Sequence, residues 1–534
     1  MNFDISILLD KLIDTDSIRF NSEFNKMAKI HKYWSRKPWH IIENYILKYS
    51  NKNDLVLDSF CGSGSVGLES ILNDRNFIGY DLNPAAVFLS ENTLNLDFDI
   101  ADFTKEILVL EQEIKPLLMD SYKISDNKYI LYLISGKNDK DYNCVISDYN
   151  FDNKRKINHH CAYTQEITDI SFPDAYFPEK FYKDRFSYKG IKKVSDMFSR
   201  RNLNVLASLY DYIQNKDFKY KDLLMLAFSN TLLHVSKLKA ENVRPLSVNN
   251  YWIPDDFIEE NVIWRFLDRL QNIRIAKTTI DKRKRLKKTN GSVYQIFNKS
   301  SLGLEDLADK SIDYVITDPP YGDAIQYSEL SYMWNCWLNK EYAINDEVII
   351  NPMQGKGIKE FHIQIEQFIR STQRVLKDDA YFTLCFQNKE IKIWLEIIQT
   401  IKDNGFELHD IEIYDTFGSP YNKHWSKFSP KSDLYVTFRN TSVKEVNSLQ
   451  LVTTPYEIIS TISNHFKEND IPFDLHKGYD LFVALLISEV FRGKKVIDYQ
   501  SFSLKKIIEI FEKQNEHGIK QERSVRSIQT ELFV

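Results

Sequence analysis

The fold is decided by the stretch Asp54-Leu55-Val56-Leu57-Asp58-Ser59-Phe60-Cys61-Gly62-Ser63-Gly64-Ser65-Val66-Gly67. Its first part is a short apolar run, which predicts a buried strand, and its last part continues as a helix through Leu72. The glycines between them let the backbone approach a ligand closely, and the helix N-terminus presents free N–H groups there. Strand, Gly-rich turn and helix together predict the first βα unit of a doubly wound sheet.

The next predicted strand supports this interpretation. It begins at Phe77 and ends at Gly79-Tyr80-Asp81-Leu82, so an acidic residue follows the Gly-rich turn by about 20 residues. A carboxylate at that place accepts hydrogen bonds from ribose hydroxyls. We therefore predict that Asp81 binds a ribose and that Leu82 lies against an adenine ring, the alternative being an ordinary acidic residue in a turn.

A second motif follows another buried strand, Ile312-Asp313-Tyr314-Val315-Ile316. There Thr317-Asp318-Pro319-Pro320-Tyr321 predicts a stiff corner, because two consecutive prolines cannot continue a β-ladder and each restricts its own backbone. A carboxylate beside an aromatic ring suits a flat molecule with an exocyclic amine, such as a base flipped out of a duplex. For the tetrapeptide taken alone, the less favoured alternative is a Pro-Pro turn after a buried strand with a chance Asp and Tyr.

Asp318-Pro319-Pro320-Tyr321 resembles the catalytic motif of amino-methyltransferases, the S-adenosylmethionine (SAM)-dependent enzymes that methylate adenine N6 or cytosine N4 in DNA. Phe60-x-Gly62-x-Gly64 is similar to the F-x-G-x-G pattern by which that family binds SAM, and it lacks the spacing of a dinucleotide loop. The basic and aromatic segment from His31 to His40 resembles one that closes over the methionine end of SAM in a subgroup of the family. The resemblance covers residues 31–95 and 290–440.

The resemblance implies SAM as cofactor and an α/β fold of the SAM-dependent methyltransferase type, a Rossmann-like, doubly wound mixed sheet. The residues expected to bind SAM are Lys37, Asp58, Phe60, Gly62, Gly64, Asp81, Leu82 and Asn298. Asn298 is assigned because it follows the predicted strand Val293-Tyr294-Gln295-Ile296-Phe297. For the segment that contains Lys37, the alternative is an aromatic-capped helix start.

The expected reaction is methyl transfer from SAM to a base flipped out of double-stranded DNA. Asp318 and the backbone carbonyl of Pro319 would accept the amino hydrogens and aim the nitrogen lone pair at the methyl group. Pro320 stiffens the corner, and Tyr321 would stack on the base. An Asp in the first position favours adenine N6, because cytosine N4 enzymes more often have Ser there. Cytosine N4 methylation, RNA or tRNA methylation and a non-catalytic DNA-binding relative remain alternatives.

Composition limits the function classes. The 534 residues are 43% hydrophobic and 27% charged, ordinary values for a soluble protein, and the net charge of −5 means that a nucleic-acid surface must be a local patch. Five scattered cysteines favour a reducing compartment. Cys144, His159, His160 and Cys161 lack paired C-x-x-C spacing, so we predict no metal site. Neither a signal peptide nor an apolar run near the about 20 residues of a membrane span is evident, and we expect a cytoplasmic protein.

Four regions are expected along the chain. Residues 1–100 and 291–440 would form the two parts of the methyltransferase core, the first with the SAM loop and the second with the catalytic corner. Residues 101–290 would form an inserted α+β recognition region. Residues 441–534 would form a small separate helical domain with a terminal peptide.

Two basic stretches are candidates for contact with the DNA backbone, one mixed with aromatic residues and one at the end of a long predicted helix. Their cations are Lys192, Lys193, Arg200, Arg201, Arg283, Arg285 and Lys287. A solvated helix face and a solvated helix end are the respective alternatives. The basic, aromatic loop of residues 418–425 could also touch DNA.

The chain ends with Gln529-x-x-Leu532-Phe533, which resembles the peptide by which bacterial proteins bind the replication sliding clamp. The Gln would satisfy polar groups, and the two apolar residues would fill a pocket. A docked apolar C-terminus is the alternative. A cognate restriction or defence component is the other partner that the resemblance implies, and the sequence does not identify it.

Overall fold

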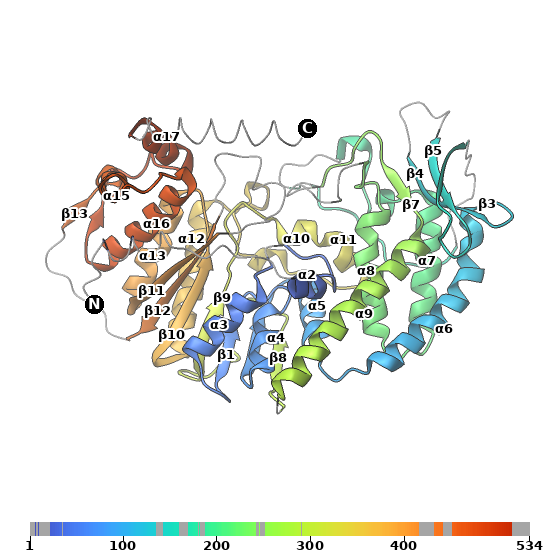
Figure 1. Cartoon of the computed structure of the whole chain (residues 1–534), viewed down its shortest axis with the longest axis horizontal. Helices are drawn as coiled ribbons and strands as arrows, with labels where there is room; N and C mark the ends of the chain where they lie inside the picture. The colour runs from blue at the N-terminus through green and yellow to red at the C-terminus, as the bar shows by residue number, and fades with distance from the viewer. Residues whose placement is uncertain are drawn as a thin grey trace.

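The structure is a computed structural model that describes residues 6, 9, 22–34, 36–134, 142–159, 169–179, 181, 187–241, 245, 251–289, 291–415, 432–441 and 451–514. The molecule is elongated, with a large sheet and the C-terminal helices on one side and an inserted region on the other (Figure 1). None of the described helices is long and apolar enough to cross a membrane.

A seven-stranded sheet with the order β11-β12-β10-β9-β1-β2-β8 forms the centre of the fold. Its strands are β1 (Leu55–Asp58), β2 (Asn76–Tyr80), β8 (Tyr294–Phe297), β9 (Ile312–Thr317), β10 (Leu376–Phe386), β11 (Phe406–Asp415) and β12 (Ser432–Asn440). All neighbours pair in parallel except β12, which runs antiparallel between β10 and β11. The predicted doubly wound mixed sheet is confirmed, and the chain order reverses direction between β1 and β9.

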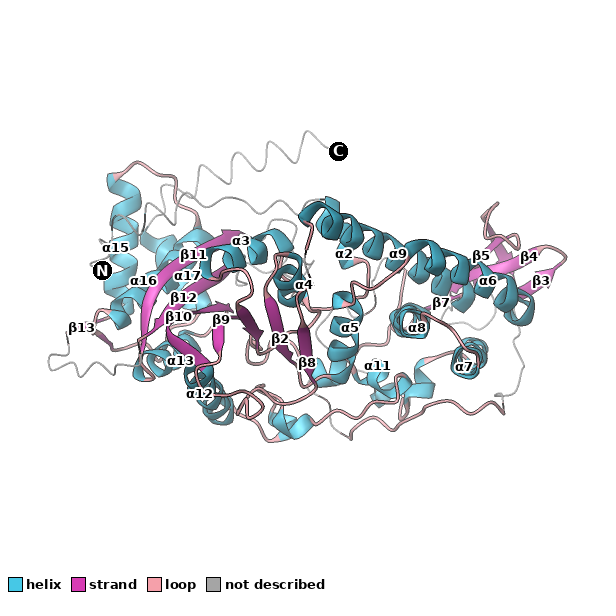
Figure 2. Cartoon of the chain, turned by 90° about the horizontal axis from the view of Figure 1, so that it is seen from below, coloured by secondary structure: helices cyan, strands magenta, loops and turns pink. Residues whose placement is uncertain are grey.

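Helices cover both faces of this sheet (Figure 2). Val56, Tyr314 and Ile316 pack with α3 (Trp39–Tyr49) and α4 (Ser65–Leu72) on one face. Leu57 and Val315 belong to the core on the other face, with α12 (Ile358–Val375) and α13 (Ile391–Asp403). Successive strand residues point to opposite faces, so a run of apolar residues without alternation serves both cores.

In the sheet, β8 is the neighbour of β2, but along the chain it follows the inserted region. The sequence near residue 100 therefore shows no third strand of the sheet. The insertion has a second sheet of β3 (Lys123–Ser125), β4 (Lys128–Ile134), β5 (Tyr142–Ser147), β6 (Arg155–His159) and β7 (Ile258–Glu260). Its helices are α6 (Ile100–Leu118), α7 (Arg200–Asn215), α8 (Lys221–Val235) and α9 (Val262–Lys287).

The hydrophobic core of the insertion also contains residues that follow the carboxyl ends of β2 and β9. It also includes α5 (Pro84–Leu94) and two short helices that follow the Pro-Pro corner, α10 (Tyr327–Leu330) and α11 (Tyr332–Trp337). Trp334 and Trp337 of α11 are fully buried there. The segment after the corner is therefore held by the insertion as well as by the sheet.

The C-terminal helices are joined to the sheet, which corrects the prediction of a separate domain. Residues of α15 (Pro455–Glu468), α16 (Leu475–Phe491) and α17 (Leu504–Gln514) share one core with β10, β11, α12 and α13. The expectation failed because a periodic apolar face does not show which surface it covers.

The remaining described elements are short. They are α2 (Ser22–Ala28), the strand pair β13 (Val452–Thr453) and β14 (Lys495–Val496), and the 3₁₀ turns η1 (Met119–Tyr122), η2 (Ser187–Lys189), η3 (Val194–Met197), η4 (Ile344–Asp346) and η5 (Pro352–Gln354).

A buried ion pair joins the last helix of the insertion to the core. Arg283 of α9 and Glu69 of α4 are 5% and 0% exposed, and the two guanidinium nitrogens lie 2.5 and 2.7 Å from the carboxylate oxygens. The guanidinium also lies over the ring of Trp39, 3.8 Å from its centroid. This bidentate pair fixes α9 against α4 and α3.

Replacing Arg283 with Met should lower the free energy of unfolding by about 3 kcal/mol, because Glu69 would be left buried without its hydrogen-bonding and charged partner. The measurement is the midpoint of denaturant unfolding followed by circular dichroism. Arg285→Met is the matched control on the same helix, since its side chain is 76% exposed, and it should change stability by less than about 0.5 kcal/mol. Equal effects of the two substitutions would contradict the structural role of the pair.

Candidate active site

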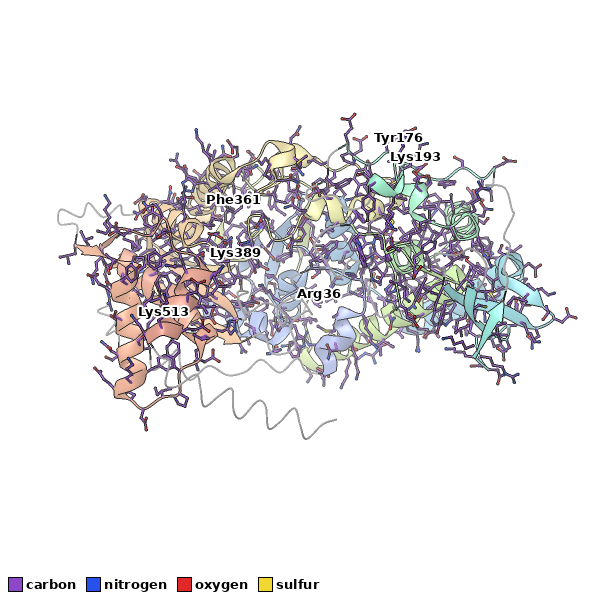
Figure 3. All side chains as sticks on the ribbon, turned by 90° about the horizontal axis from the view of Figure 1, so that it is seen from above. Arg36, Tyr176, Lys193, Phe361, Lys389 and Lys513 are labelled. Atoms are coloured by element: carbon purple, nitrogen blue, oxygen red, sulfur yellow. The ribbon has the colours of Figure 1, made fainter. Side chains whose placement is uncertain are left out.

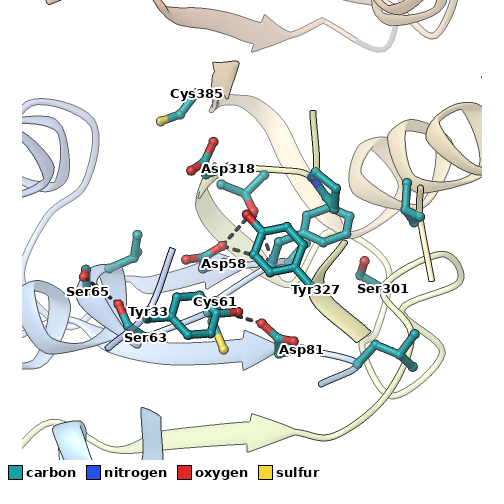
Figure 4. A pocket seen from close by; sticks show the side chains of 18 of the residues that line it. Tyr33, Asp58, Cys61, Ser63, Ser65, Asp81, Ser301, Asp318, Tyr327 and Cys385 are labelled. Carbon is teal, nitrogen blue, oxygen red and sulfur yellow. Dashed lines mark hydrogen bonds between the residues drawn. The ribbon is translucent and has the colours of Figure 1, made fainter. Parts of the chain in front are cut away.

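A pocket opens at the carboxyl edge of the central sheet, where ligands bind in folds of this class. Asp58 ends β1, Asp81 follows β2 and Asp318 follows β9, and the three side chains surround the same space (Figure 4). Cys385 of β10 closes one end of the pocket. The reversal of chain order between β1 and β9 separates the loops and so leaves room for a ligand.

The Gly-rich turn requires glycine at two positions with left-handed backbone. Gly62 has φ +50°, and a Cβ there would lie 2.8 Å from Cε1 of Tyr33. Gly64 has φ +77°, and its Cβ would lie 2.7 Å from Cδ1 of Leu94 and 3.2 Å from Cα of Ser90. Gly62 therefore admits the ring of Tyr33, whereas Gly64 allows α4 to approach α5 and does not line the pocket.

Asp81 holds the turn through its backbone contacts. Its carboxylate accepts hydrogen bonds from the N–H groups of Gly62 and Asn83, both at 2.8 Å. Burial raises the pKa of Asp81 to about 6, although these two bonds oppose the shift. Asn298 donates to the carbonyl oxygens of Asp81 and Leu82 at 3.0 and 3.1 Å, so it fixes the backbone of this turn from outside the pocket.

Asp58 and Thr317 connect the two motifs. Thr317 Oγ1 donates to Asp58 Oδ1 at 2.7 Å and accepts from the N–H of Phe60 at 3.1 Å. Burial raises the pKa of Asp58 to about 7, against the hydrogen bonds from Thr317 and Phe60 and with a further contribution from Asp318. The end of β9 and the start of the Gly-rich turn are thus locked together.

Four polar groups meet at the Pro-Pro corner, and Lys37 contacts the other three. Tyr321 donates its hydroxyl hydrogen to Asp318 Oδ1. Lys37, which is 8% exposed, places its Nζ 2.7 Å from Tyr321 Oη and 3.2 Å from Oδ2 of both Asp318 and Asp433. Lys37 thus bonds to the corner, which the sequence interpretation did not foresee. Asp433 was missed because it lies at the start of β12, far from both motifs in sequence.

The neighbouring charges shift the pKa values of the corner groups in opposite directions. Burial raises the pKa of Asp318 to about 6, Lys37 and the hydrogen bond from Tyr321 lower it, and Asp433 raises it. Burial alone would lower the pKa of Lys37, but Asp318 and Asp433 raise it well above its usual value. At neutral pH, Lys37 is therefore a cation and Asp318 a carboxylate.

Arg36 contributes a second cation to the pocket wall. Its guanidinium donates to the carbonyl oxygens of Ala28 and His31 at 2.8 and 3.2 Å and to Ser63 Oγ at 3.1 Å. Within the described ranges no carboxylate pairs with it, and burial lowers its pKa to about 10. A half-buried cation beside a Gly-rich turn, without an acidic partner in the described part of the chain, is suited to bind an anionic group.

Aromatic rings form the opposite wall of the pocket. The rings of Tyr33 and Tyr327 stack with centroids 6.2 Å apart, and Tyr342 also lines the pocket. The Tyr342 hydroxyl donates to Glu347, which also accepts from the N–H and hydroxyl of Ser328. Tyr327 ends the segment of residues 322–327, which directly follows the corner and whose position predicts a loop over the pocket, whereas Tyr342 and Glu347 lie in a segment without a recognisable motif.

The predicted cofactor and catalytic residues gather in one place, and their roles remain predictions. Those that line the pocket are Lys37, Asp58, Phe60, Gly62, Asp81, Leu82, Asp318 and Pro320. Those adjacent to these residues in the turn and the corner are Gly64, Asn298, Pro319 and Tyr321.

Two of the predicted DNA-backbone contacts are wrong, because their side chains are buried in ion pairs. Arg201 is 4% exposed and lies 2.9 Å from Glu259, and Arg283 is held by Glu69. Lys287 bonds to Glu43 and Asn73. Arg285 is exposed, but the end of α9 lies near the start of β8, at the edge of the sheet opposite the corner (Figure 1).

Lys192 and Arg200 are exposed, and Lys193 is half-buried. The ammonium of Lys193 lies over the ring of Tyr176, 4.7 Å from its centroid, and this ring is 67% exposed (Figure 3). Tyr332 of α11 donates to the backbone carbonyl of Tyr176 at 2.6 Å, which ties this surface to the segment after the corner. These cations stay candidates for DNA contact.

Several predictions concern residues outside the described part of the chain. They include the terminal peptide with Gln529, Leu532 and Phe533, the loop of residues 418–425, and His160 and Cys161. Among the residues that the structure describes, no group of three or more His, Cys, Asp or Glu side chains could hold a metal ion.

Comparison with known proteins gives a consistent result. A family model described as DNA methylase matches residues 15–92. The Type II methyltransferase M.MvaI of Kocuria varians is 25% identical over 300 residues, which cover 47% of this chain and 61% of that protein. The chain thus spans less than two thirds of the length of this relative.

The Type II methyltransferase M.MjaII of Methanocaldococcus jannaschii is 22% identical over 409 residues, which cover 69% of this chain and 73% of that protein. Among solved structures, the rRNA methyltransferase aviRa from Streptomyces viridochromogenes aligns with this chain at a TM-score of 0.29 and 10% sequence identity. The alignment covers 80% of this chain and 98% of that structure's chain, and this TM-score indicates only a weak likeness. The family model and the Type II relatives thus show that this chain is similar to DNA methylases, over residues 15–92 for the family model and over 69% of the chain for M.MjaII.

Proposed function

We propose that this protein transfers a methyl group from SAM to the exocyclic N6 of an adenine flipped out of double-stranded DNA. The observation that carries the proposal is the convergence of Asp81 and the Gly62 turn with the Asp318 corner in one pocket. One part suits a nucleoside cofactor, and the other presents an acceptor where a planar amine could enter.

The residues of the pocket fit SAM. Arg36, which has no acidic partner within the described ranges, would hold the carboxylate of the methionine part. Asp81 keeps lone pairs for the ribose hydroxyls beyond the two backbone N–H bonds that it accepts, and Leu82 lies where the adenine would pack. When bound, SAM supplies an electrophilic methyl group on its sulfonium sulfur.

The corner would prepare the amine. An exocyclic amine is a poor nucleophile because its lone pair is delocalised into the ring, so it must be oriented and polarised. Asp318 and the carbonyl of Pro319 would accept its two hydrogens and direct the lone pair toward the methyl group. Asp318, with a pKa of about 6, could also take the proton that the nitrogen loses after methylation.

The substrate must displace an existing bond at the corner. Tyr321 donates to Asp318 Oδ1, and Lys37 occupies Oδ2. An amino group that enters would replace the Tyr321 hydroxyl at Oδ1, while Lys37 keeps the other oxygen and the charge of the carboxylate. The ring of Tyr321 packs edge-on against Phe386, with centroids 5.3 Å apart, which limits how far it can move.

The choice of adenine rests on the Asp at the first position of the motif, and cytosine N4 is the alternative. Duplex DNA methylated by the wild-type protein with isotopically labelled SAM should yield labelled N6-methyladenine when digested to nucleosides and analysed by mass spectrometry. Labelled N4-methylcytosine would contradict the choice of base. Label in tRNA but not in DNA would contradict the choice of DNA as substrate.

Replacing Asp318 with Ala should lower kcat for DNA methylation by about 100-fold or more, because the charged acceptor for the amine is lost. SAM affinity, measured by calorimetry, should change little. Asp309→Ala is the control, since Asp309 precedes the same strand and its side chain is 73% exposed. An Asp318→Ala variant as active as the wild type would refute the catalytic role.

The rate should rise with pH through about 6, because Asp318 must lose its proton to accept the amino hydrogens and burial raises its pKa to about 6. The KM for SAM should increase below the same pH, since protonated Asp81, also with a pKa of about 6, binds ribose hydroxyls less well. Rates measured from about pH 5 to about pH 9 at several SAM concentrations separate the effect on kcat from the effect on the KM for SAM. A kcat independent of pH in this range would exclude the requirement for a carboxylate.

A further inference from the structure

Asp433 is a second carboxylate at the Pro-Pro corner, and it belongs to neither of the two sequence motifs. Its Oδ2 lies 3.2 Å from the ammonium of Lys37, the same distance as Oδ2 of Asp318. With Tyr321 Oη at 2.7 Å, the ammonium has three oxygen neighbours, as many as it has hydrogens to donate. Lys37 therefore bridges the two carboxylates.

The position of Asp433 is set by the C-terminal helices. The preceding residue, Ser432, donates its hydroxyl hydrogen to Asp480 of α16 at 2.5 Å, and Gln387 donates to the Ser432 carbonyl at 3.1 Å. The same helix holds the other side of the corner, where Tyr479 donates to the Asn388 carbonyl at 2.6 Å and Asn388 donates to the Tyr321 carbonyl at 3.3 Å. Contacts of α16 thus support the backbone on both sides of the corner.

The charges of this cluster indicate what Asp433 contributes to it. Lys37 alone beside Asp318 would offset its charge, whereas Asp433 adds a second carboxylate on the same ammonium. During methyl transfer, positive charge moves from the sulfonium sulfur to the amine nitrogen, which is toward the corner. A fixed negative charge there stabilises the transition state more than the ground state.

We propose that Asp433 and Lys37 are positioning residues that hold Asp318 as an oriented carboxylate, and that the Asp433 carboxylate adds negative charge beside the reacting centre. The proposal rests on the methyl transfer proposed above and names groups that act on Asp318. Asp433 anchors Lys37, so that the ammonium stays in place when Tyr321 gives way to the amine.

Other groups that face Asp318 must be included in its titration. Asp58 comes from β1, Cys385 from β10 and Tyr435 from β12, and burial raises the pKa of each of them. Lys37 and the Tyr321 hydroxyl lower the pKa of Asp318, whereas Asp433 raises it. The two positioning residues therefore shift Asp318 in opposite directions, which a purely structural role would not do.

The test is the pH dependence of kcat in two variants of the full chain. Lys37→Met should move the acidic limb up by about one pH unit, because a neighbouring cation lowers a carboxyl pKa by about that much or more. Asp433→Asn keeps an oxygen for Lys37 but removes the charge, so the acidic limb should move down. Its plateau kcat should nevertheless fall by about tenfold or more, with the KM for SAM little changed.

Lys48→Met is the matched control. Lys48 lies on α3, the helix that begins two residues after Lys37. Its ammonium lies 2.8 Å from a carboxylate oxygen of Asp410 and 2.8 Å from one of Glu412, both on β11, and 46% of its side chain is exposed. This substitution removes an ion pair between α3 and the sheet without touching the corner. The proposal predicts an unchanged acidic limb, and a shift equal to that of Lys37→Met would assign the effect to loosened packing of α3.

A second measurement does not depend on activity. The infrared band of the protonated Asp318 carboxyl, identified by its loss in Asp318→Asn, can be titrated in each variant with its fold checked by circular dichroism. A higher pKa in Lys37→Met and a lower one in Asp433→Asn support the proposal, and shifts in the same direction or no shifts overturn it. Absence of methyl transfer by the wild type would refute the proposed function, while the infrared titration would still decide the coupling.

Discussion

Parallel pairing of β1 with β9 is the constraint on which the rest of the site depends. Leu57 pairs with Val315, so the Gly-rich turn and the Pro-Pro corner leave the sheet side by side although more than two hundred residues separate them. The hydrogen bonds of Thr317 with Asp58 and Phe60 extend this pairing beyond the strands. Because both segments leave the sheet at its carboxyl edge, residues of both motifs line one pocket.

Burial then determines the charges of this pocket. Asp58, Asp81 and Asp318 all have raised pKa values because they lie in a poorly solvated space at the strand ends. Lys37 offsets that penalty at the corner, and Asp433 balances Lys37. The ammonium of Lys37 thus bridges two carboxylates at the end of the strands.

The two regions outside the sheet both brace the corner. The insertion buries Trp334 and Trp337 of the segment that follows it, and Asn335 donates to Asn83 Oδ1 at 3.0 Å, next to the Asp81 turn. The C-terminal helix α16 fixes Asn388 and Ser432 on the other side. Contacts from both regions therefore fix the backbone on either side of the corner.

The sequence by itself determined the strands, the two turns and the residues Asp58, Asp81 and Asp318 at the strand ends. It could do so because glycines and prolines restrict the backbone locally, and because a buried parallel strand needs a continuous apolar run. Only the tertiary structure decided that Lys37 bonds to the corner, that Asp433 joins it, that Arg201 and Arg283 are buried in ion pairs, and that the C-terminal helices belong to the main core. Each of these depends on contacts between segments far apart in the chain, and an isolated charge or an apolar helix face does not specify its partner.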